Sequence, residues 1–204
     1  SDGSFPDQGD RIKNIKDYGF DLGGPIIKDR LWFYGSYGKQ DIKLLRLTNT
    51  PDDTVLPSYN AKLNWQATGS DMISVFWFQG GKEKTGRSGS AAAAGNLTYL
   101  DRTLWDQGKE WPGSPHGLSK VEWNHVFGPS FFLTGKAARY NTGFNLIPQG
   151  GLEDNHWVWD TVRQEARGTA YGQAFGRPQD TLSLDGSYFA NGMGGNHELK
   201  FGLG

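Results

Sequence analysis

Side chains able to carry chemistry are widely separated in this chain of 204 residues. The four histidines show no HExxH pattern, in which two histidines on one helix face bind zinc. No GxSxG sequence is present to place a serine nucleophile on a sharp turn. The absence of cysteine excludes thiolate metal ligands and disulfides. We therefore predict that the chain is not an enzyme and has no catalytic residue, metal site or cofactor.

Tryptophans in polar stretches are the main candidates for ligand contact. They lie in two long polar segments, 80–116 and 143–178, where large aromatic side chains are less expected because such segments face water. Two interpretations are open: the rings stack on a sugar or a flat organic ligand, or they pack the long segments onto one another. The candidate residues are Trp105, Trp111, His156, Trp157 and Trp159.

Strands with two different faces are predicted from the alternation of side chains. Residues 59–67 alternate apolar with polar residues, and this period of two is typical of a β-strand. The same alternation recurs at 182–188 and 199–203. The polar positions of the first strand are Asn60, Lys62, Asn64 and Gln66. The apolar positions in these strands include Tyr59, Leu63, Trp65, Leu182, Leu184, Leu199 and Phe201.

About eight strands in four hairpins are predicted along the chain. Short turns are expected near residues 28, 69, 129 and 193, and long loops at 46–58, 80–116 and 143–178. Each strand has roughly the 9–11 residues that a tilted strand needs to cross a bilayer. Short turns on one side and long loops on the other are typical of outer-membrane barrels.

The predicted fold is therefore an all-β antiparallel meander. It forms a partial, open transmembrane barrel with short periplasmic turns and long extracellular loops. In this arrangement the polar positions named above line an aqueous lumen, and the apolar positions face lipid.

The composition agrees with strands and excludes other classes. The 30 glycines, 12 phenylalanines, 8 tryptophans and 8 tyrosines favour strands and turns over helical bundles. A net charge of −1 gives no electrostatic reason to expect nucleic acid as a partner. No apolar run approaches the roughly 20 residues that a transmembrane helix requires.

A family resemblance is carried by residues 23–37, GGPIIKDRLWFYGSY. This stretch resembles the LGGPI-x-KD-+-LFFFGSY signature of TonB-dependent receptors, specifically the Oar-like group. The strand pair 59–65 and 72–78 resembles the next hairpin of that family, and residues 196–202, NHELKFG, resemble its recurrent HxLKFG strand. The first motif is fairly specific, whereas the later ones are generic for barrel strands.

The resemblance implies an active transporter in a Gram-negative-type cell outer membrane, with a barrel of about 22 strands and a plugged lumen. It implies three partners: outer-membrane lipid, a TonB-type energy-coupling protein that acts through a plug domain, and an unidentified small-molecule, sugar or peptide ligand. The chain shows no plug domain and no TonB box. We therefore expect residues 1–13 to be a polar irregular lead-in after a missing plug, and residues 14–204 to be barrel, truncated at both ends.

A second functional class remains open on the residues alone. The chain could be a soluble or cell-surface β-sandwich that binds carbohydrate through aromatic loops. In a sandwich, Tyr59, Leu63 and Trp65 pack inward against a second sheet, whereas in a barrel they meet lipid. What covers the apolar face separates the two classes.

Overall fold

The described part of the chain folds almost entirely into β-strands. The computed structural model describes residues 10–45, 51–88, 102–107, 117–148, 158–162, 165–167, 173–192 and 194–204. Among these residues there is no helix, and twelve strands belong to one sheet. All of the pairings between neighbouring strands are antiparallel. The predicted all-β class is confirmed.

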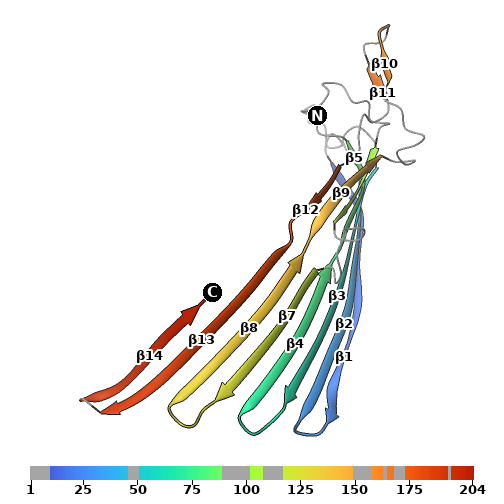
Figure 1. Cartoon of the computed structure of the whole chain (residues 1–204). Coiled ribbons are helices and arrows are strands. Elements are labelled where there is room, and N and C mark those ends of the chain that lie inside the picture. Colours follow the sequence, from blue (N-terminus) through green and yellow to red (C-terminus); the bar gives the residue numbers. More distant parts are fainter. Residues whose placement is uncertain are drawn as a thin grey trace, which may run out of the picture.

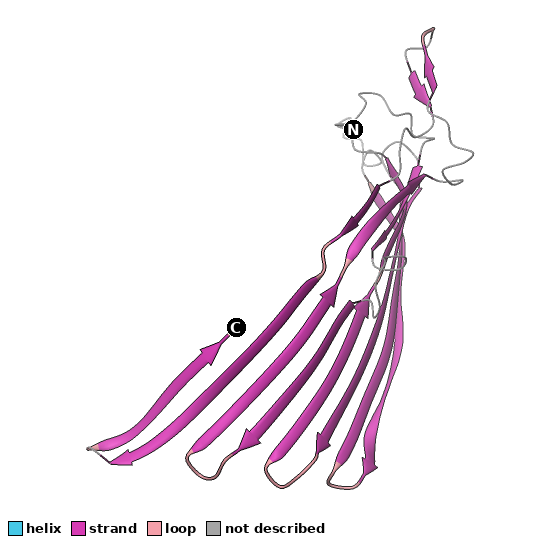
Figure 2. Ribbon diagram, in the orientation of Figure 1, coloured by secondary structure: helices cyan, strands magenta, loops and turns pink. Residues whose placement is uncertain are grey.

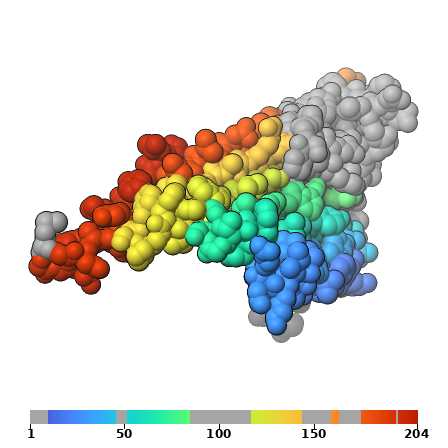
Figure 3. Space-filling model, turned by 60° about the horizontal axis from the view of Figure 1, so that its bottom comes forward, coloured from blue at the N-terminus to red at the C-terminus, as the bar shows by residue number. Residues whose placement is uncertain are grey.

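The sheet is built mainly from eight long strands in four hairpins (Figures 1 and 2). They are β1 (Arg11–Ile27), β2 (Leu31–Leu45), β3 (Pro51–Gln66), β4 (Asp71–Gly80), β7 (Gly117–Val126), β8 (Phe131–Asn141), β13 (Gln179–Gly192) and β14 (Gly195–Leu203). Each strand pairs with the next in this order. The sheet is open, with β1 at one edge and β14 at the other, as the space-filling view also shows (Figure 3).

The four hairpins close with short turns at one end of the sheet, at the bottom of Figure 1. In the first turn the Arg30 amide donates to the Ile27 carbonyl at 3.1 Å, and Asp29 adopts a φ of 60°. Aspartate is one of the few residues that tolerate this left-handed conformation. The other turns follow β3, β7 and β13. The turns predicted near 28, 69, 129 and 193 are confirmed.

The segments predicted as long loops contain further strands, and that part of the prediction is wrong. These strands are β5 (Lys82–Ser88), β6 (Arg102–Gln107), β9 (Gly143–Pro148) and β12 (Gln173–Gly176). β5 continues β4, because both pair with β3 in one unbroken register in which Gly80 opposes Ser58 and Glu83 opposes Val55. β9 and β12 extend β8 and β13 in the same way. β6 pairs with β5 and β9, just as β7 pairs with β4 and β8. The sheet therefore continues beyond the start of β7, with β6 in the position next to the extended strands.

Several strand boundaries also differ from the prediction. β1 begins at Arg11, inside the segment expected to be irregular, and β3 begins at Pro51, inside the expected loop 46–58. β1 contains Pro25 near its end, with a register shift between Pro25 and Ile27. An edge strand can hold a proline because one side of it makes no ladder hydrogen bonds. A separate two-stranded ribbon is formed by β10 (Val158–Asp160) and β11 (Glu165–Arg167).

The sheet does not enclose an apolar core within the described residues. The buried residues whose exposure is described carry polar side chains or none: Asp52, Ser74, Thr134, Asn141, Gly143 and Gly186. A sheet in water normally buries its large aliphatic and aromatic side chains. Here these side chains lie at the surface, so the chemistry of the two faces becomes the central question.

Candidate functional site

One face of the sheet is apolar across the eight long strands, and we call it the apolar face. Directly paired residues of antiparallel strands have their side chains on the same side, so the register assigns each residue to a face. Leu63 pairs with Phe33 and with Val75. The same row continues through Val121 and Ala137 to Leu182. The register places on this face all seven predicted apolar positions: Tyr59, Leu63, Trp65, Leu182, Leu184, Leu199 and Phe201.

The apolar face is exposed. Leu63 and Trp65 in the middle of the sheet are 43% and 47% exposed, and Leu182 and Leu199 are 74% and 60% exposed. Scattered apolar residues on a surface need no explanation, whereas a continuous exposed apolar face is typical of surfaces that contact lipid or another protein.

Two rows of aromatic rings cross the apolar face. The first row crosses β1 to β4 six or seven residues from the strand ends at the short turns, and its ring centroids are 5.2–6.5 Å apart. It consists of Phe20, Tyr37, Tyr59 and Trp77. The second row starts beside the β7–β8 turn and reaches β14, with centroids 4.0–6.1 Å apart. It consists of Trp123, His125, Phe127, Phe131 and Phe201.

The opposite face, which we call the polar face, carries the four predicted polar positions Asn60, Lys62, Asn64 and Gln66. Asn64 continues as a row through Ser74, Glu122, Lys136 and Ser183. Every residue in this row can donate or accept hydrogen bonds.

Hydrogen bonds link neighbouring strands on the polar face. The Ser74 hydroxyl donates to Asn64 Oδ1 at 2.8 Å, and the Thr134 hydroxyl donates to Asn124 Oδ1 at 2.8 Å. Ser74 and Thr134 are only 8% and 7% exposed. Polar side chains are therefore more buried here than large apolar side chains are on the other face.

Several charged side chains on the polar face form pairs of opposite sign. Glu122 accepts from Lys120 at 3.1 Å and from the Asn124 amide at 3.2 Å. Lys136 lies 3.5 Å from Asp185. Partly exposed ion pairs each contribute little to stability, and they are characteristic of a surface that remains wet.

The polar face also contains aromatic residues that the alternation alone did not assign. On β2, Trp32 and Tyr34 lie on the polar face, while Phe33 lies on the apolar face. On β4, Phe76 and Phe78 pair with Lys62 and Asn60 and therefore share the polar face. Residues 31–34 of β2 and 75–78 of β4 are apolar on both faces. Their alternation therefore does not show which side chains face which way, and the pairing with β3 fixes it.

The predicted ligand-contact residues are not brought together in the described part of the chain. Trp105 lies in β6 and pairs with Leu146 of β9. Trp159 is exposed and belongs to the separate ribbon of β10 and β11. The remaining candidates, Trp111, His156 and Trp157, lie outside the described residues. Both interpretations of the tryptophans therefore stay predictions.

No protein-family model, curated protein or solved structure matches this chain. The chemistry of the two faces is therefore the structural observation from which a function can be inferred. The described residues contain no helix with the length and hydropathy needed to span a membrane. They also contain no group of three or more histidine, aspartate or glutamate side chains that could hold a metal ion.

A cluster around Asp71, at the turn between β3 and β4, was missed by sequence reasoning. Asp71 Oδ1 accepts from Trp123 Nε1 at 2.9 Å and lies 2.5 Å from His125 Nδ1, while Oδ2 accepts from the Thr68 hydroxyl at 2.5 Å. Hydrogen bonds from His125, Thr68 and Trp123 lower the pKa of Asp71 from 3.8 to about 2. No sequence signal links residues more than fifty positions apart, and only the register between β4 and β7 brings them together.

Proposed function

We propose that this chain forms part of the wall of an outer-membrane β-barrel, in a TonB-dependent receptor that takes up a nutrient ligand. The observation that carries the proposal is that large apolar side chains are exposed and polar side chains are buried, the opposite of a sheet in water. Large apolar residues are exposed on the apolar face of β1, β3, β4, β7, β13 and β14, while the hydroxyls of Ser74 and Thr134 are buried on the polar face. Lipid outside and water inside a barrel favour this arrangement.

The aromatic rows support the same proposal. Membrane barrels carry girdles of aromatic residues where the hydrocarbon meets the headgroups, because these rings are amphipathic. On the apolar face, the rows of Tyr59 and Phe131 lie on either side of aliphatic residues such as Leu63, Val75 and Val121.

The lengths of the strands support an orientation for the wall. β1 has 17 residues and β3 has 16, whereas about 9–11 tilted residues cross a bilayer. The short turns would face the periplasm, and the strand extensions β5, β6, β9 and β12 would project to the outside. In this orientation the polar segments 80–116 and 143–178 would lie on the outer side of the membrane, where they can meet a ligand.

The receptor class rests on the resemblance of residues 23–37, which form the end of β1, the first turn and the start of β2. On that basis the polar face lines the lumen, and uptake is driven by a TonB-type partner acting through a plug domain. Asn60, Lys62, Asn64 and Gln66 would line the route of the ligand.

The proposal is tested by placing the same charge on the two faces of β3. In the full-length protein, Leu63→Arg should impair assembly into the membrane, because an arginine facing lipid near the midplane costs about 2–4 kcal/mol. Asn64→Arg should assemble better than Leu63→Arg, because its side chain lies on the polar face, although it loses the hydrogen bond that Ser74 donates to Asn64. The measurement is the fraction of folded protein in the outer membrane, detected by its altered gel mobility before heating. Equal assembly of the two variants would show that the faces are assigned wrongly.

The soluble sandwich is tested by expression without detergent. We expect the chain to associate or precipitate in water, since its apolar face has no cover in the described residues. A monomer that unfolds cooperatively in buffer would overturn the membrane proposal.

A further inference from the structure

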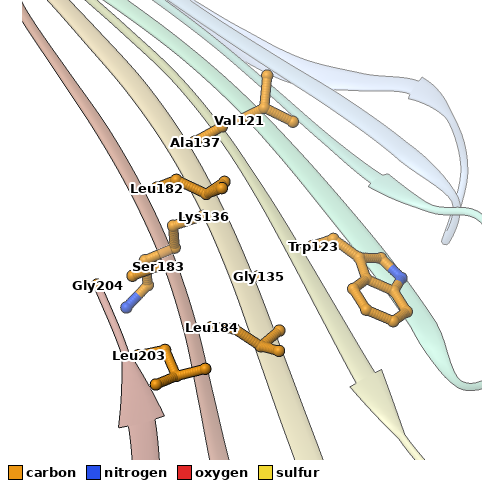
Figure 4. Close-up of a pocket in the computed structure, with 10 residues that line it drawn as sticks. All are labelled: Val121, Trp123, Gly135, Lys136, Ala137, Leu182, Ser183, Leu184, Leu203 and Gly204. Carbon is orange, nitrogen blue, oxygen red and sulfur yellow. The ribbon is translucent and has the colours of Figure 1, made fainter.

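A groove crosses the apolar face over β7, β8 and β13. It consists of two neighbouring hollows of about 590 Å³ each, and both are lined by Val121 and Ala137. The first hollow, drawn in Figure 4, extends to Leu203 on β14. The second extends in the opposite direction along β8, to Arg139 and Asp180.

The groove exists because β8 carries small residues at successive positions of the apolar face. Gly135 has no side chain and Ala137 has only a methyl group, whereas the neighbouring strands present Trp123 and Leu184 beside them. A methyl group added at Gly135 would lie 3.6 Å from Trp123 and 3.8 Å from Leu184, which are ordinary contact distances. The space above β8 is thus bounded on both sides without being filled.

Both hollows are lined mainly by apolar atoms, and the far end of the second holds Arg139, which pairs with Ser119 and Asp180 in the sheet. Lys136 and Lys120 also line the hollows, but each is paired with a carboxylate of the polar face, Asp185 and Glu122 respectively. Arg139 Nη1 lies 3.8 Å from Asp180 Oδ1, too far for a hydrogen bond, and both side chains are largely exposed. The guanidinium group can therefore turn its donors to an anion at the end of the groove.

We propose that this groove seats one acyl chain of a phosphate-bearing lipid, whose phosphate is bound by Arg139. The inference rests on the proposed function, in which the apolar face meets lipid. A hydrocarbon chain needs no hydrogen bonds and matches the apolar walls, while a phosphate matches the paired donors of a guanidinium group. A peptide segment fits less well, because its backbone groups would lack partners along Ala137 and Val121.

Lipid titration of the full-length protein in detergent micelles tests the groove. The two probes are phosphatidylglycerol and a diacylglycerol with the same acyl chains, and bound lipid is counted by native mass spectrometry. Arg139→Gln should weaken phosphatidylglycerol binding roughly ten- to hundredfold, as expected for about one charge-assisted hydrogen bond, and leave diacylglycerol binding unchanged. Ala137→Leu fills the groove and should weaken binding of both lipids by a similar factor.

Matched variants elsewhere on the apolar face serve as controls. Lys39→Gln removes a cation from β2, and Ala61→Leu adds the same bulk on β3, both outside the groove. Neither should change lipid binding. The groove inference is overturned if Arg139→Gln acts no more strongly than Lys39→Gln, or Ala137→Leu no more strongly than Ala61→Leu.

The outcome for the groove can be separated from the outcome for the membrane proposal. If the Leu63→Arg and Asn64→Arg pair behaves as expected but the groove variants bind lipid like wild type, only the groove inference fails. If the protein is a folded monomer without detergent, both fail.

Discussion

Gly117 is the first residue of β7, and it adopts a φ of 83°. Side chains rarely tolerate this left-handed conformation. A Cβ atom added at Gly117 would also press against the carbonyl oxygen of Phe78 and the backbone of Gln79. Glycine is therefore required here twice, once by conformation and once by the close approach of β4.

Gly117→Ala should lower the free energy of unfolding by about 1–3 kcal/mol or more, because strain and the backbone clash add. Gly128→Ala is the control for strain alone, since Gly128 has a φ of 120° but open space around it. Chemical unfolding of both variants in lipid vesicles measures the difference. A smaller loss for Gly117→Ala than for Gly128→Ala would contradict the close approach of β7 to β4.

The hairpin of β3 and β4 is fixed at its turn by a charged group. Thr68 and Asp71 bond to each other within the turn, and Asp71 also holds Trp123 and His125 of β7. The turn therefore ties three strands together rather than two. Asp71 is the first residue of β4, at the short-turn end of the hairpin, which the proposed orientation places on the periplasmic side of the membrane.

Asp71 gives this hairpin a dependence on pH. Because the folded pKa is lower than the ordinary value, the stability that the ionised carboxylate contributes is present above about pH 4 and is lost as the pH falls toward about 2. We expect the unfolding temperature in micelles to fall between about pH 5 and about pH 2.5, and Asp71→Asn to reduce this fall. Asp29→Asn makes the same change in another short turn and is the control. An unaltered pH profile in Asp71→Asn would contradict this role.

At the scale of the whole molecule, the sheet has two open edges. β3, β4, β7 and β8 have neighbours on both sides, whereas β1 and β14 each have one among the described strands. Exposed edges invite pairing with other strands, and β1 carries Lys13, Lys16 and Pro25, residue types that discourage it. The isolated chain is therefore expected to be least stable at its two edges.

Hydrogen exchange of the 204-residue chain in micelles should follow this gradient. Amides of β1 and β14 should exchange at least about tenfold faster than those of β4 and β7, because stability decreases toward edges with fewer partners. Peptide-level mass spectrometry resolves these strands. Equal protection at the centre and at the edges would show that β1 and β14 are covered by other strands.

The alternation within single strands was sufficient to predict a large part of this structure. Asn64 and Leu63 could be assigned to opposite faces because successive side chains on a strand point to opposite sides, a property of a few neighbouring residues. Glycine, proline and charged residues marked the four short turns for the same local reason. The all-β class and the order of the hairpins followed from these two signals.

Only the tertiary structure decided what depends on pairing between distant residues. Phe33 and its neighbours Trp32 and Tyr34 are all apolar, so their faces were fixed by register with β3. The strands β5, β6, β9 and β12 have weak patterns of their own and form because an existing strand edge offers hydrogen bonds. The contact of Asp71 with His125 has the same origin. A sequence specifies local periodicity, whereas register is a property of two strands together, and a shift of one residue would exchange the two faces.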